Sequence, residues 1–310
     1  MAFSAEVIAD SITPEGHRLT TIEVSIQRDE LAQLNKHRVI SNSAESLRAM
    51  PVSVVVRKAL DDPAMPLRWN ANQQGMQAGG ALHDEDAERA DKIIRTVRDV
   101  SILGAVALNG GVERLRDPAL QEDIEALQRQ YPHIQFEPLT QAAHKENANR
   151  ILAPHLYTRV LLTATEWVNF FALRANEQAQ PEIQRAARLM IEAMAASTPT
   201  VLRPGQWHLP YVLPEERSLP AETQLKLSAA RCARISYSTH GTTKPNIEKD
   251  IALADRLRRD GHMTPFEHQA TPMGLFQRIF KRWSANFQYW NQYRQNIPGQ
   301  AVFDPNRIAA

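Results

Sequence analysis

The sequence predicts an α+β protein in which an antiparallel strand core is flanked by helices. The strand prediction rests on Ile22, Val24 and Ile26, which alternate with polar residues at the period of a half-buried strand. A turn signal at Pro14 precedes them, so we expect residues 5–28 to form a hairpin. The helix prediction rests on several later segments whose apolar residues recur at helical spacing.

Helices are expected from just after the hairpin to the last third of the chain. The expected ranges are 29–35, 84–108, 117–130, 141–176 with a break at Pro154, 181–197, 225–238 and 245–260. A polar ordered loop is expected at 66–80 and a proline-rich extended connection at 199–221. The aromatic tail is interpreted as a packed covering helix, with a base-stacking surface as the alternative.

The second half of the region 141–176 is apolar around most of its circumference, which is typical of a buried helix. Asn169 and Arg174 would then lie inside the protein, where polar groups are costly unless they are paired or bind a ligand. An internally satisfied Asn169 and an Arg174 at the helix end are the alternative.

Length and charge limit the possible function classes. The chain has 310 residues, 43% of them apolar, enough for one large domain or two ordinary ones. Its net charge is +1, so no global field favours DNA, RNA or an anionic membrane as partner. It has no apolar run of about eighteen residues and no signal-peptide pattern, which predicts a cytoplasmic protein.

Cys232 is the single cysteine of the chain. Because the chain has only this cysteine, a disulfide or a multi-thiolate metal site within one chain is excluded. We interpret it as a small buried hydrophobe, with a catalytic thiol as the alternative. No metal is expected, because the histidines lack zinc-binding spacing, and neither a P-loop nor a G-x-G-x-x-G motif is present.

The stretch from Lys36 to Arg48 carries the most informative chemistry. It combines cations with short hydroxyl donors, namely Lys36, His37, Arg38 and Arg48 interleaved with Ser41, Ser43 and Ser46. Such groups can hold phosphate and carbonyl oxygens, because an arginine binds them through two parallel hydrogen bonds. A solvated basic turn is the plainer alternative.

The spacing of this stretch resembles the signature R-H-R-x-x-S-x-N-E-x-S-x-R of flavin-dependent thymidylate synthases. The matching residues are His37, Arg38, Ser41, Ser46 and Arg48. Lys36 replaces the first arginine, and Ser43 and Ala44 stand where the family usually has Asn and Glu.

Four further stretches are similar to motifs of the same family. They are HMTPFEH at 262–268 (family H-x-S-P-F-E-H), ARISYS with Arg234 and Ser236 (A-R-V-S), KENANRILAP and LYTR at 145–159 (E-x-A-R-x-x-L-P and Y-T), and NFFALRANEQAQPEI at 169–183 (N-F-L-x-L-R-x-x-x-x-A-Q-x-E-I). Together the matches extend from about residue 33 to residue 268.

The order of these motifs differs from that of typical members, in which S-P-F-E-H precedes R-H-R. The resemblance therefore implies a flavin-dependent thymidylate synthase-like fold with permuted motif order, in a long form such as those of phages and bacteria. Residues 1–310 would form one catalytic domain with a helical insertion at about 109–140 and an aromatic C-terminal extension at about 270–310. Gln292-Tyr293-Arg294 faintly resembles the run-up to R-H-R, so partial duplication is the alternative to permutation.

The resemblance also implies roles for individual residues. The nucleotide substrate would be bound by Gln33, Lys36, Ser46, Arg48, Arg150 and Arg174, of which Ser46 and Arg174 would act in catalysis. The flavin would be bound by His37, Arg38, Asn169, His262, Thr264 and Glu267. Thr163 and Thr165 replace the N-x-R pair that the family has shortly before Asn169.

The implied reaction transfers a one-carbon unit from 5,10-methylenetetrahydrofolate to C5 of dUMP, giving dTMP with FAD and NADPH. A reduced flavin can deliver hydride and mediate carbon transfer, so a protein thiolate is not required. A hydroxymethylase acting on dUMP or dCMP is one alternative, and a non-catalytic nucleotide-binding homologue is another. The family also implies a homotetramer with sites shared between chains.

Overall fold

A five-stranded sheet forms the centre of the protein in a computed structural model that describes residues 3–75, 77–237 and 245–298. Its strands are β1 (Ser4–Ile12), β2 (Arg18–Gln27), β3 (Ser41–Ala44), β4 (Tyr157–Ala164) and β5 (Thr200–Val201), in the order β3-β4-β2-β1-β5. All neighbouring strands are antiparallel except β1 and β5. The predicted hairpin and the antiparallel strand core are confirmed.

The helix predicted for residues 157–164 is wrong, because this stretch is the strand β4. β4 pairs with β2 along its whole length and with β3 at residues 160–163. The middle of this strand is the apolar run from Val160 to Leu162, and periodicity alone does not separate such a short run from a buried helix. The helix α6 (Val168–Arg174) begins only after β4 has ended.

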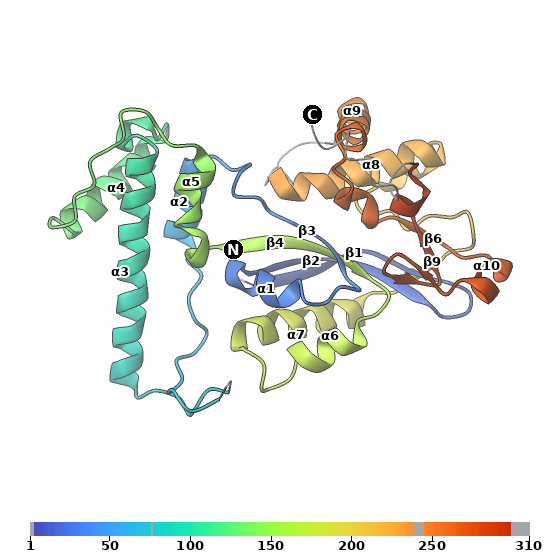
Figure 1. The fold of residues 1–310 in the computed structure, drawn as a ribbon, viewed down its shortest axis with the longest axis horizontal. Helices are drawn as coiled ribbons and strands as arrows, with labels where there is room; N and C mark the ends of the chain where they lie inside the picture. Colours follow the sequence, from blue (N-terminus) through green and yellow to red (C-terminus); the bar gives the residue numbers. More distant parts are fainter. Residues whose placement is uncertain (1–2, 76, 238–244, 299–310) are drawn as a thin grey trace, which may run out of the picture.

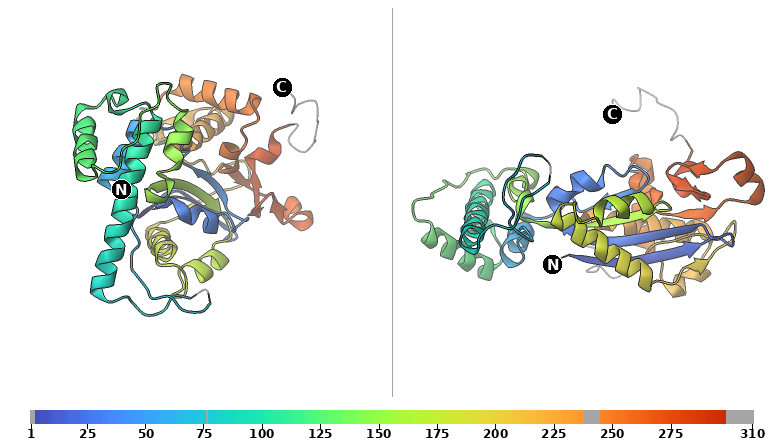
Figure 2. Two further views of the ribbon diagram at one scale, coloured as in Figure 1. Left: turned by 60° about the vertical axis from the view of Figure 1, so that its left-hand side comes forward. Right: turned by 90° about the horizontal axis from the view of Figure 1, so that it is seen from below.

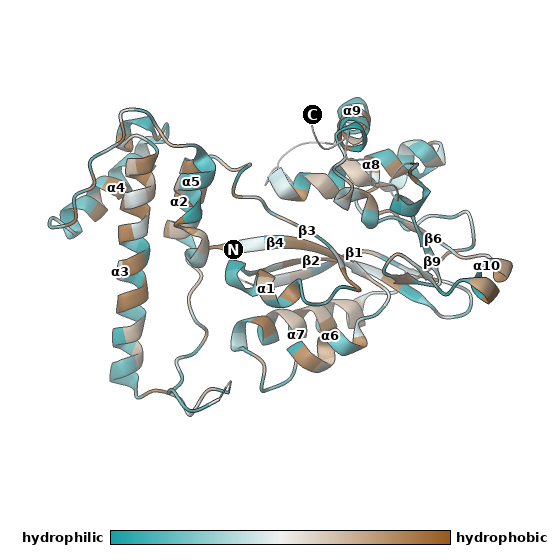
Figure 3. Ribbon diagram, in the orientation of Figure 1, coloured by the Kyte–Doolittle hydropathy of each residue, from teal (hydrophilic) through white to brown (hydrophobic). Residues whose placement is uncertain are grey.

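One face of the sheet is apolar and packs on short and long helices (Figure 1). Ile22, Val24 and Ile26 of β2 and Val160 and Leu162 of β4 point to this side. They pack against α6 and α7 (Pro181–Ala196), and α1 (Leu31–Leu34) lies at the same face. Figure 3 shows hydrophobic residues recurring along β4 and on α6 and α7.

The opposite face of the sheet lies under α8 (Ala221–Arg234) and α9 (Ile247–Arg259). Here Leu161 of β4 packs with Cys232 and Ile235. Many of the other side chains on this face of the sheet are polar, including Thr21 and Thr163, which are fully buried. The same two strands therefore present an apolar face to one layer and a largely polar face to the other.

A helical lobe stands at one end of the sheet, as Figures 1 and 2 show. It consists of α2 (Val52–Asp61), α3 (Asp84–Leu108), α4 (Pro118–Gln130) and α5 (Lys145–Arg150), which share a core of their own. Asp117 caps the N-terminus of α4, since the backbone N of Ala119 donates to Asp117 Oδ1 over 3.1 Å. Gly110, with φ of 92°, supplies the left-handed turn after α3.

The C-terminal segment covers the other end of the sheet without the expected long helix. It contains β6 (Ala270–Pro272), α10 (Leu275–Phe280), β7 (Trp283–Ser284), β8 (Phe287–Gln288) and β9 (Trp290–Gln292). Phe287 and Trp290 are fully buried against Leu19, so these aromatic side chains pack rather than form a stacking surface. Left-handed φ angles at Ala285 and Tyr289 interrupt the helix that the composition suggested. Residues 299–310 of the predicted extension lie outside the described residues.

Candidate functional site

A cavity of about 550 Å³ opens on the polar side of the sheet, beside the end of β3. Its walls come from the basic stretch, the end of α8 and the segment after α9. The lining residues are Asn42, Ser43, Ala44, Ser46, Arg48, Ala49, His144, Ala233, Ser236, Tyr237, Leu257, His262, Thr264 and Pro265. The cavity therefore brings together two predicted substrate residues, Ser46 and Arg48, with two predicted flavin residues, His262 and Thr264.

Local backbone contacts explain why such distant segments meet. The backbone N of Ser46 donates to the carbonyl of Ser236 over 3.1 Å, which ties the basic stretch to the turn after α8. Gly261 ends α9 in the left-handed region, with φ of 78°. The backbone N of His262 then donates back to the carbonyl of Leu257 over 2.8 Å, and the chain turns toward the cavity.

Two arginines at this site share one carboxylate. Arg48 Nε lies 3.3 Å from Glu146 Oε2, and Arg150 Nη2 lies 3.5 Å from Glu146 Oε1. The arginine side chains are 74% and 71% exposed, so these ion pairs contribute little stability and can be exchanged for another anion. Sequence reasoning missed Glu146, although its position four residues before Arg150 on α5 is a signal for such a pair.

A second group of predicted site residues lies on the α6 side of the sheet. Arg174 Nη1 donates to Gln33 Oε1 over 2.7 Å, and Arg174 Nε donates to His37 Nε2 over 3.1 Å. His37 therefore accepts at Nε2, and burial, followed by the charge of Arg174, lowers its pKa. Phe170 of α6 contacts the imidazole edge-on, with ring centroids 4.9 Å apart. We call Gln33, His37 and Arg174 the Gln33 group; none of them lines the cavity.

Glu30 contacts the Gln33 group through a hydrogen bond from Gln33. Its Oε2 accepts a hydrogen bond from Gln33 Nε2 over 2.9 Å, and the same nitrogen lies 2.8 Å from Gln180 Oε1. Burial, followed by the charges of the nearby carboxylates of Asp29 and Glu182, raises the pKa of Glu30 to about 7. A carboxyl that titrates near neutral pH beside a predicted substrate residue was not foreseen from the sequence.

The remaining predicted residues lie apart from both groups. Lys36, Arg38 and Asn169 are exposed, and the expectation that Asn169 is buried in a helix is wrong. It fails because α6 is a short surface helix, whose outer side carries Asn169 beside the exposed Val168. Glu267 forms an ion pair with Arg294 of the C-terminal segment.

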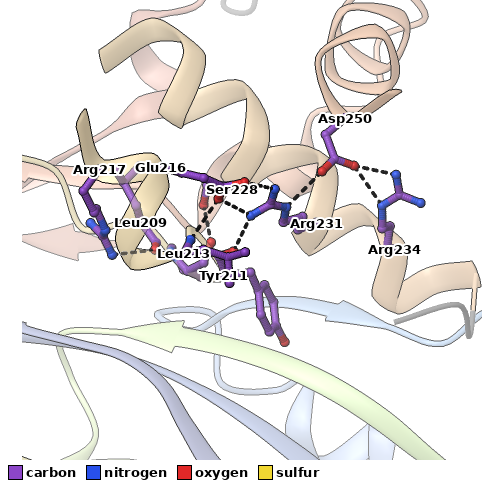
Figure 4. A network of polar contacts seen from close by, with 10 residues as sticks. Leu209, Tyr211, Leu213, Glu216, Arg217, Ser228, Arg231, Arg234 and Asp250 are labelled. Atoms are coloured by element: carbon purple, nitrogen blue, oxygen red, sulfur yellow. Dashed lines mark hydrogen bonds and ion pairs between the residues drawn. The ribbon is translucent and has the colours of Figure 1, made fainter. Parts of the chain in front are cut away.

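A buried ion network fixes the helices that frame the cavity (Figure 4). Arg231 of α8 donates to both carboxylate oxygens of Glu216 over 2.6 Å and to Asp250 of α9 over 2.9 Å. Arg234, the arginine of the ARISYS stretch, donates to the same Asp250. The network joins α8, α9 and the connection before α8, so Arg234 acts here as a positioning residue for the Ser236 wall.

Cys232 is fully buried between α8 and the sheet. Burial raises its pKa well above the usual range of a thiol. The side chain is therefore a packed hydrophobe and not an available thiolate. Among the described residues, no group of three or more His, Cys, Asp or Glu side chains is arranged to hold a metal ion. No helix within those ranges is long and apolar enough to cross a membrane.

Comparison with known families decides the identity of this scaffold. Residues 13–200 match the family described as thymidylate synthase complementing protein, and they make up more than half of the chain. The chain belongs to this family. Comparison with curated proteins gives no match.

Two solved structures from Streptomyces cacaoi are similar to this chain. Both are crystal structures of the UMP/dUMP methylase PolB. The form bound with 5-Br dUMP is 20% identical, covers 58% of this chain and 67% of its own, and has a TM-score of 0.37. The form bound with 5-Br UMP is 16% identical, covers 62% and 88%, and has a TM-score of 0.40.

Membership of the thymidylate synthase complementing family indicates an enzyme of the nucleotide methyltransferase type. The matched region includes the Gln33 group, Ser46, Arg48 and Arg150. It ends before Ser236, His262 and Thr264, which complete the cavity wall. The site of this member is thus built from the family region and from a later part of the chain.

Proposed function

We propose that this enzyme transfers a one-carbon unit from 5,10-methylenetetrahydrofolate to C5 of dUMP and forms dTMP in a flavin-dependent reaction. One observation carries the proposal beyond the family. Arg48 and Arg150 are held by a single exchangeable carboxylate beside a cavity that also contains Ser46, His262 and Thr264.

The phosphate of dUMP would bind where Glu146 now lies between the two arginines. Phosphate is a better partner than one carboxylate, because it offers more acceptor oxygens and more charge to the two guanidinium groups. Ser46 stands in the cavity wall next to Arg48 and can donate its hydroxyl hydrogen to the same phosphate. Exchange of Glu146 for phosphate would therefore couple nucleotide binding to a movement of α5.

The pyrimidine would be recognised by the Gln33 group. Arg174 offers fixed N–H donors that suit the carbonyl oxygens of uracil, and it would stabilise negative charge that develops on the activated ring. Because this group does not line the cavity of its own chain, we propose that a second copy supplies it. A homotetramer with shared sites, as the family resemblance implies, satisfies this requirement.

The cavity has the chemistry that a flavin requires. Hydroxyl and imidazole donors from Thr264, Ser236 and His262 stand beside apolar wall residues such as Leu257 and Pro265. When bound, the flavin would supply hydride and mediate carbon transfer, which a thiolate does not then need to assist. Lys36, Arg38, Asn169 and Glu267 remain proposed contacts from outside this cavity. The permuted order of the motifs belongs to the same proposal.

A hydroxymethylase is the second candidate, because Ala44, Thr163 and Thr165 replace polar or charged residues of the family pattern. A more open site would admit water to the one-carbon intermediate, whereas a closed site excludes it. The choice of dUMP or dCMP is part of the same question.

The test is to purify the protein, identify its bound cofactor and analyse its products. We expect a yellow protein that releases FAD, and a product with the mass of dTMP from dUMP, methylenetetrahydrofolate and NADPH. A product heavier by one oxygen would support hydroxymethyl transfer instead, and turnover of dCMP alone would overturn the substrate assignment. A colourless protein that cannot be reconstituted with FAD would reject the flavin mechanism.

A further inference from the structure

Six side chains form an unbroken line of hydrogen bonds across the polar face of the sheet. Starting from the cavity, Ser43 Oγ lies 2.9 Å from His268 Nε2, and His268 Nδ1 lies 2.8 Å from Thr163 Oγ1. Thr163 Oγ1 in turn lies 2.7 Å from Thr21 Oγ1. Thr21 Oγ1 lies 2.7 Å from His208 Nε2, and His208 Nδ1 lies 2.8 Å from Ser11 Oγ. The line crosses β3, β4, β2 and β1 and uses one histidine near each end.

The two ends of the line reach different cavities. Ser43 lines the candidate active cavity, and Ser11 lines a second cavity of about 560 Å³ on the β1 side of the sheet. The second cavity also contains polar side chains, among them Asp10, Ser197 and Arg217. The four inner members of the line are at most 1% exposed, so the hydrogen bonds cross the protein interior between the two cavities.

Each member of the line can donate one hydrogen and accept another. Burial lowers the pKa of His208 and His268 to about 3, so both imidazoles are neutral, with one N–H donor and one acceptor nitrogen. In one arrangement every donor points toward Ser43, whose hydroxyl hydrogen then faces the cavity. In the opposite arrangement every donor points toward Ser11.

Two members of the line stand at positions where the sequence departs from the family signature that it resembles. Ser43 and Thr163 are two positions at which the sequence departs from the family signature, which has Asn at both. A hydroxyl donates and accepts through one oxygen, whereas an amide divides these roles between two atoms. His208 and His268 lie beyond the family match at residues 13–200, and His268 is the last residue of the HMTPFEH stretch that resembles a family motif.

We propose that the line from Ser11 to Ser43 is a proton relay that feeds the candidate active cavity. A proton enters at Ser11, each member passes its own hydrogen to the next, and Ser43 delivers a proton to the cavity. No charged group remains in the interior after the transfer. Rotation of the hydroxyls and a return of each imidazole to its first tautomer would restore the starting arrangement.

The inference rests on the proposed methyl transfer, whose balance requires a proton. The C5–H bond of uracil breaks and releases one proton, while the two folate nitrogens that held the carbon each take up one. A hydride from the nicotinamide reductant completes the methyl group. The reaction therefore consumes one proton overall, whereas hydroxymethyl transfer, which adds water in place of the hydride, consumes none.

The first test needs no activity and uses the flavin-loaded or apo protein with ¹⁵N-labelled histidine. Thr21→Val breaks the middle of the line, and Thr21→Ser keeps its hydroxyl. His268 does not bond Thr21 directly, but a coupled line predicts that Thr21→Val changes the imidazole ¹⁵N shifts and tautomer balance of both His208 and His268. Thr21→Ser should restore them. A change confined to His208 would overturn the relay.

The second test measures turnover and its solvent deuterium isotope effect. Thr21→Val should lower kcat by about tenfold or more with KM for the nucleotide nearly unchanged, since proton transfer by a placed group is typically worth about a hundredfold or more. Thr21→Ser should recover most of this loss. Thr158→Val is the matched control, because Thr158 is equally buried on β4 but bonds Arg28 outside the line. We expect it to retain wild-type turnover.

The outcomes separate the relay from the proposed function. If the wild type forms dTMP and Thr21→Val keeps both its kcat and its isotope effect, the relay is wrong and the function stands. If the wild type shows no methyl transfer, the proposed function fails, and the histidine spectra still decide whether the line is coupled.

Discussion

The two faces of the central sheet are built from alternate residues of the same strands, yet they serve different purposes. Leu162 of β4 points into the apolar layer under α6 and α7, whereas its neighbour Thr163 points into the polar layer under α8. Both side chains are fully buried. The apolar layer stabilises the fold through burial, which is non-directional, while the polar layer depends on directed hydrogen bonds.

This difference teaches where tolerance to substitution should lie. A side chain of similar size can replace another in the apolar layer at modest cost, because packing volume is what matters there. In the polar layer an isosteric change removes a bond and leaves a buried partner unsatisfied. The two layers can therefore be separated experimentally by paired substitutions on one strand.

The sharpest pair is Leu162→Ala against Thr163→Val. Leu162→Ala creates a cavity in the apolar layer and should lower the free energy of unfolding by about 2–5 kcal/mol. Thr163→Val should cost less, about 1–3 kcal/mol, because it orphans the buried Nδ1 of His268. Denaturant unfolding measures the free energy of unfolding of both variants. Turnover of both is then measured at a temperature below their melting range. We expect Leu162→Ala to remain active and Thr163→Val to lose turnover; the reverse pattern would contradict the separation of roles.

The cavity and the Gln33 group can be separated in the same way. Arg48→Ala should mainly raise the nucleotide concentration that is required, because Arg48 would hold the phosphate. Arg174→Ala should lower turnover even at saturation, because Arg174 would act on the reacting ring. Loss of a charged partner of this kind typically costs about 2–5 kcal/mol. Steady-state kinetics with dUMP measure both effects, with Arg188→Ala, an exposed arginine of α7, as the control. Identical defects in Arg48→Ala and Arg174→Ala would refute this division.

The raised pKa of Glu30, which lies on the apolar side of the sheet, predicts how the free energy of unfolding depends on pH. Its pKa is raised from 4.5 to about 7 in the folded protein, so between these values the folded state holds a proton that the unfolded state has lost. The contribution of Glu30 is fully present below pH 4.5 and is lost as the pH rises to about 7, by an amount on the order of 3 kcal/mol. Glu30→Gln should remove this part of the pH dependence. Unfolding curves at pH 5 and pH 8 measure this difference. If the wild type and Glu30→Gln lost the same free energy of unfolding between the two pH values, the assignment would be wrong.

The sequence was most informative where a periodic pattern has one physical meaning. The alternation along β2 and the helix that begins at Asp117-Pro118 each have a local cause, and each is present in the structure. The strand β4 was missed because the apolar run from Val160 to Leu162 hides its alternation, and periodicity alone does not separate such a run from a buried helix. Its pairing with β2 and β3 is a property of the tertiary fold.

The candidate site was only partly predictable for a related reason. Ser46 and Arg48 line one cavity with His262 and Thr264, which the motifs had also assigned to the site, although about two hundred residues separate them in the sequence. Motif spacing did not reveal that the Gln33 group lies on the other layer, since a motif does not specify which face of a sheet a loop follows. It also missed Glu146, whose role depends on the approach of α5 to the basic stretch.

Cys232 should give the smallest effect of these substitutions, although it lies in the polar layer. Its side chain is fully buried against Leu161 and Ile235, and its raised pKa removes any thiolate at neutral pH. Cys232→Ser keeps the size of the group but buries a hydroxyl, which should lower the free energy of unfolding by about 1 kcal/mol. Turnover and the bound flavin should be unchanged, and Cys232→Ala provides a control without the hydroxyl. A folded Cys232→Ser protein that has lost turnover would show that the thiol takes part in the chemistry, and the thiol-free mechanism would then be wrong.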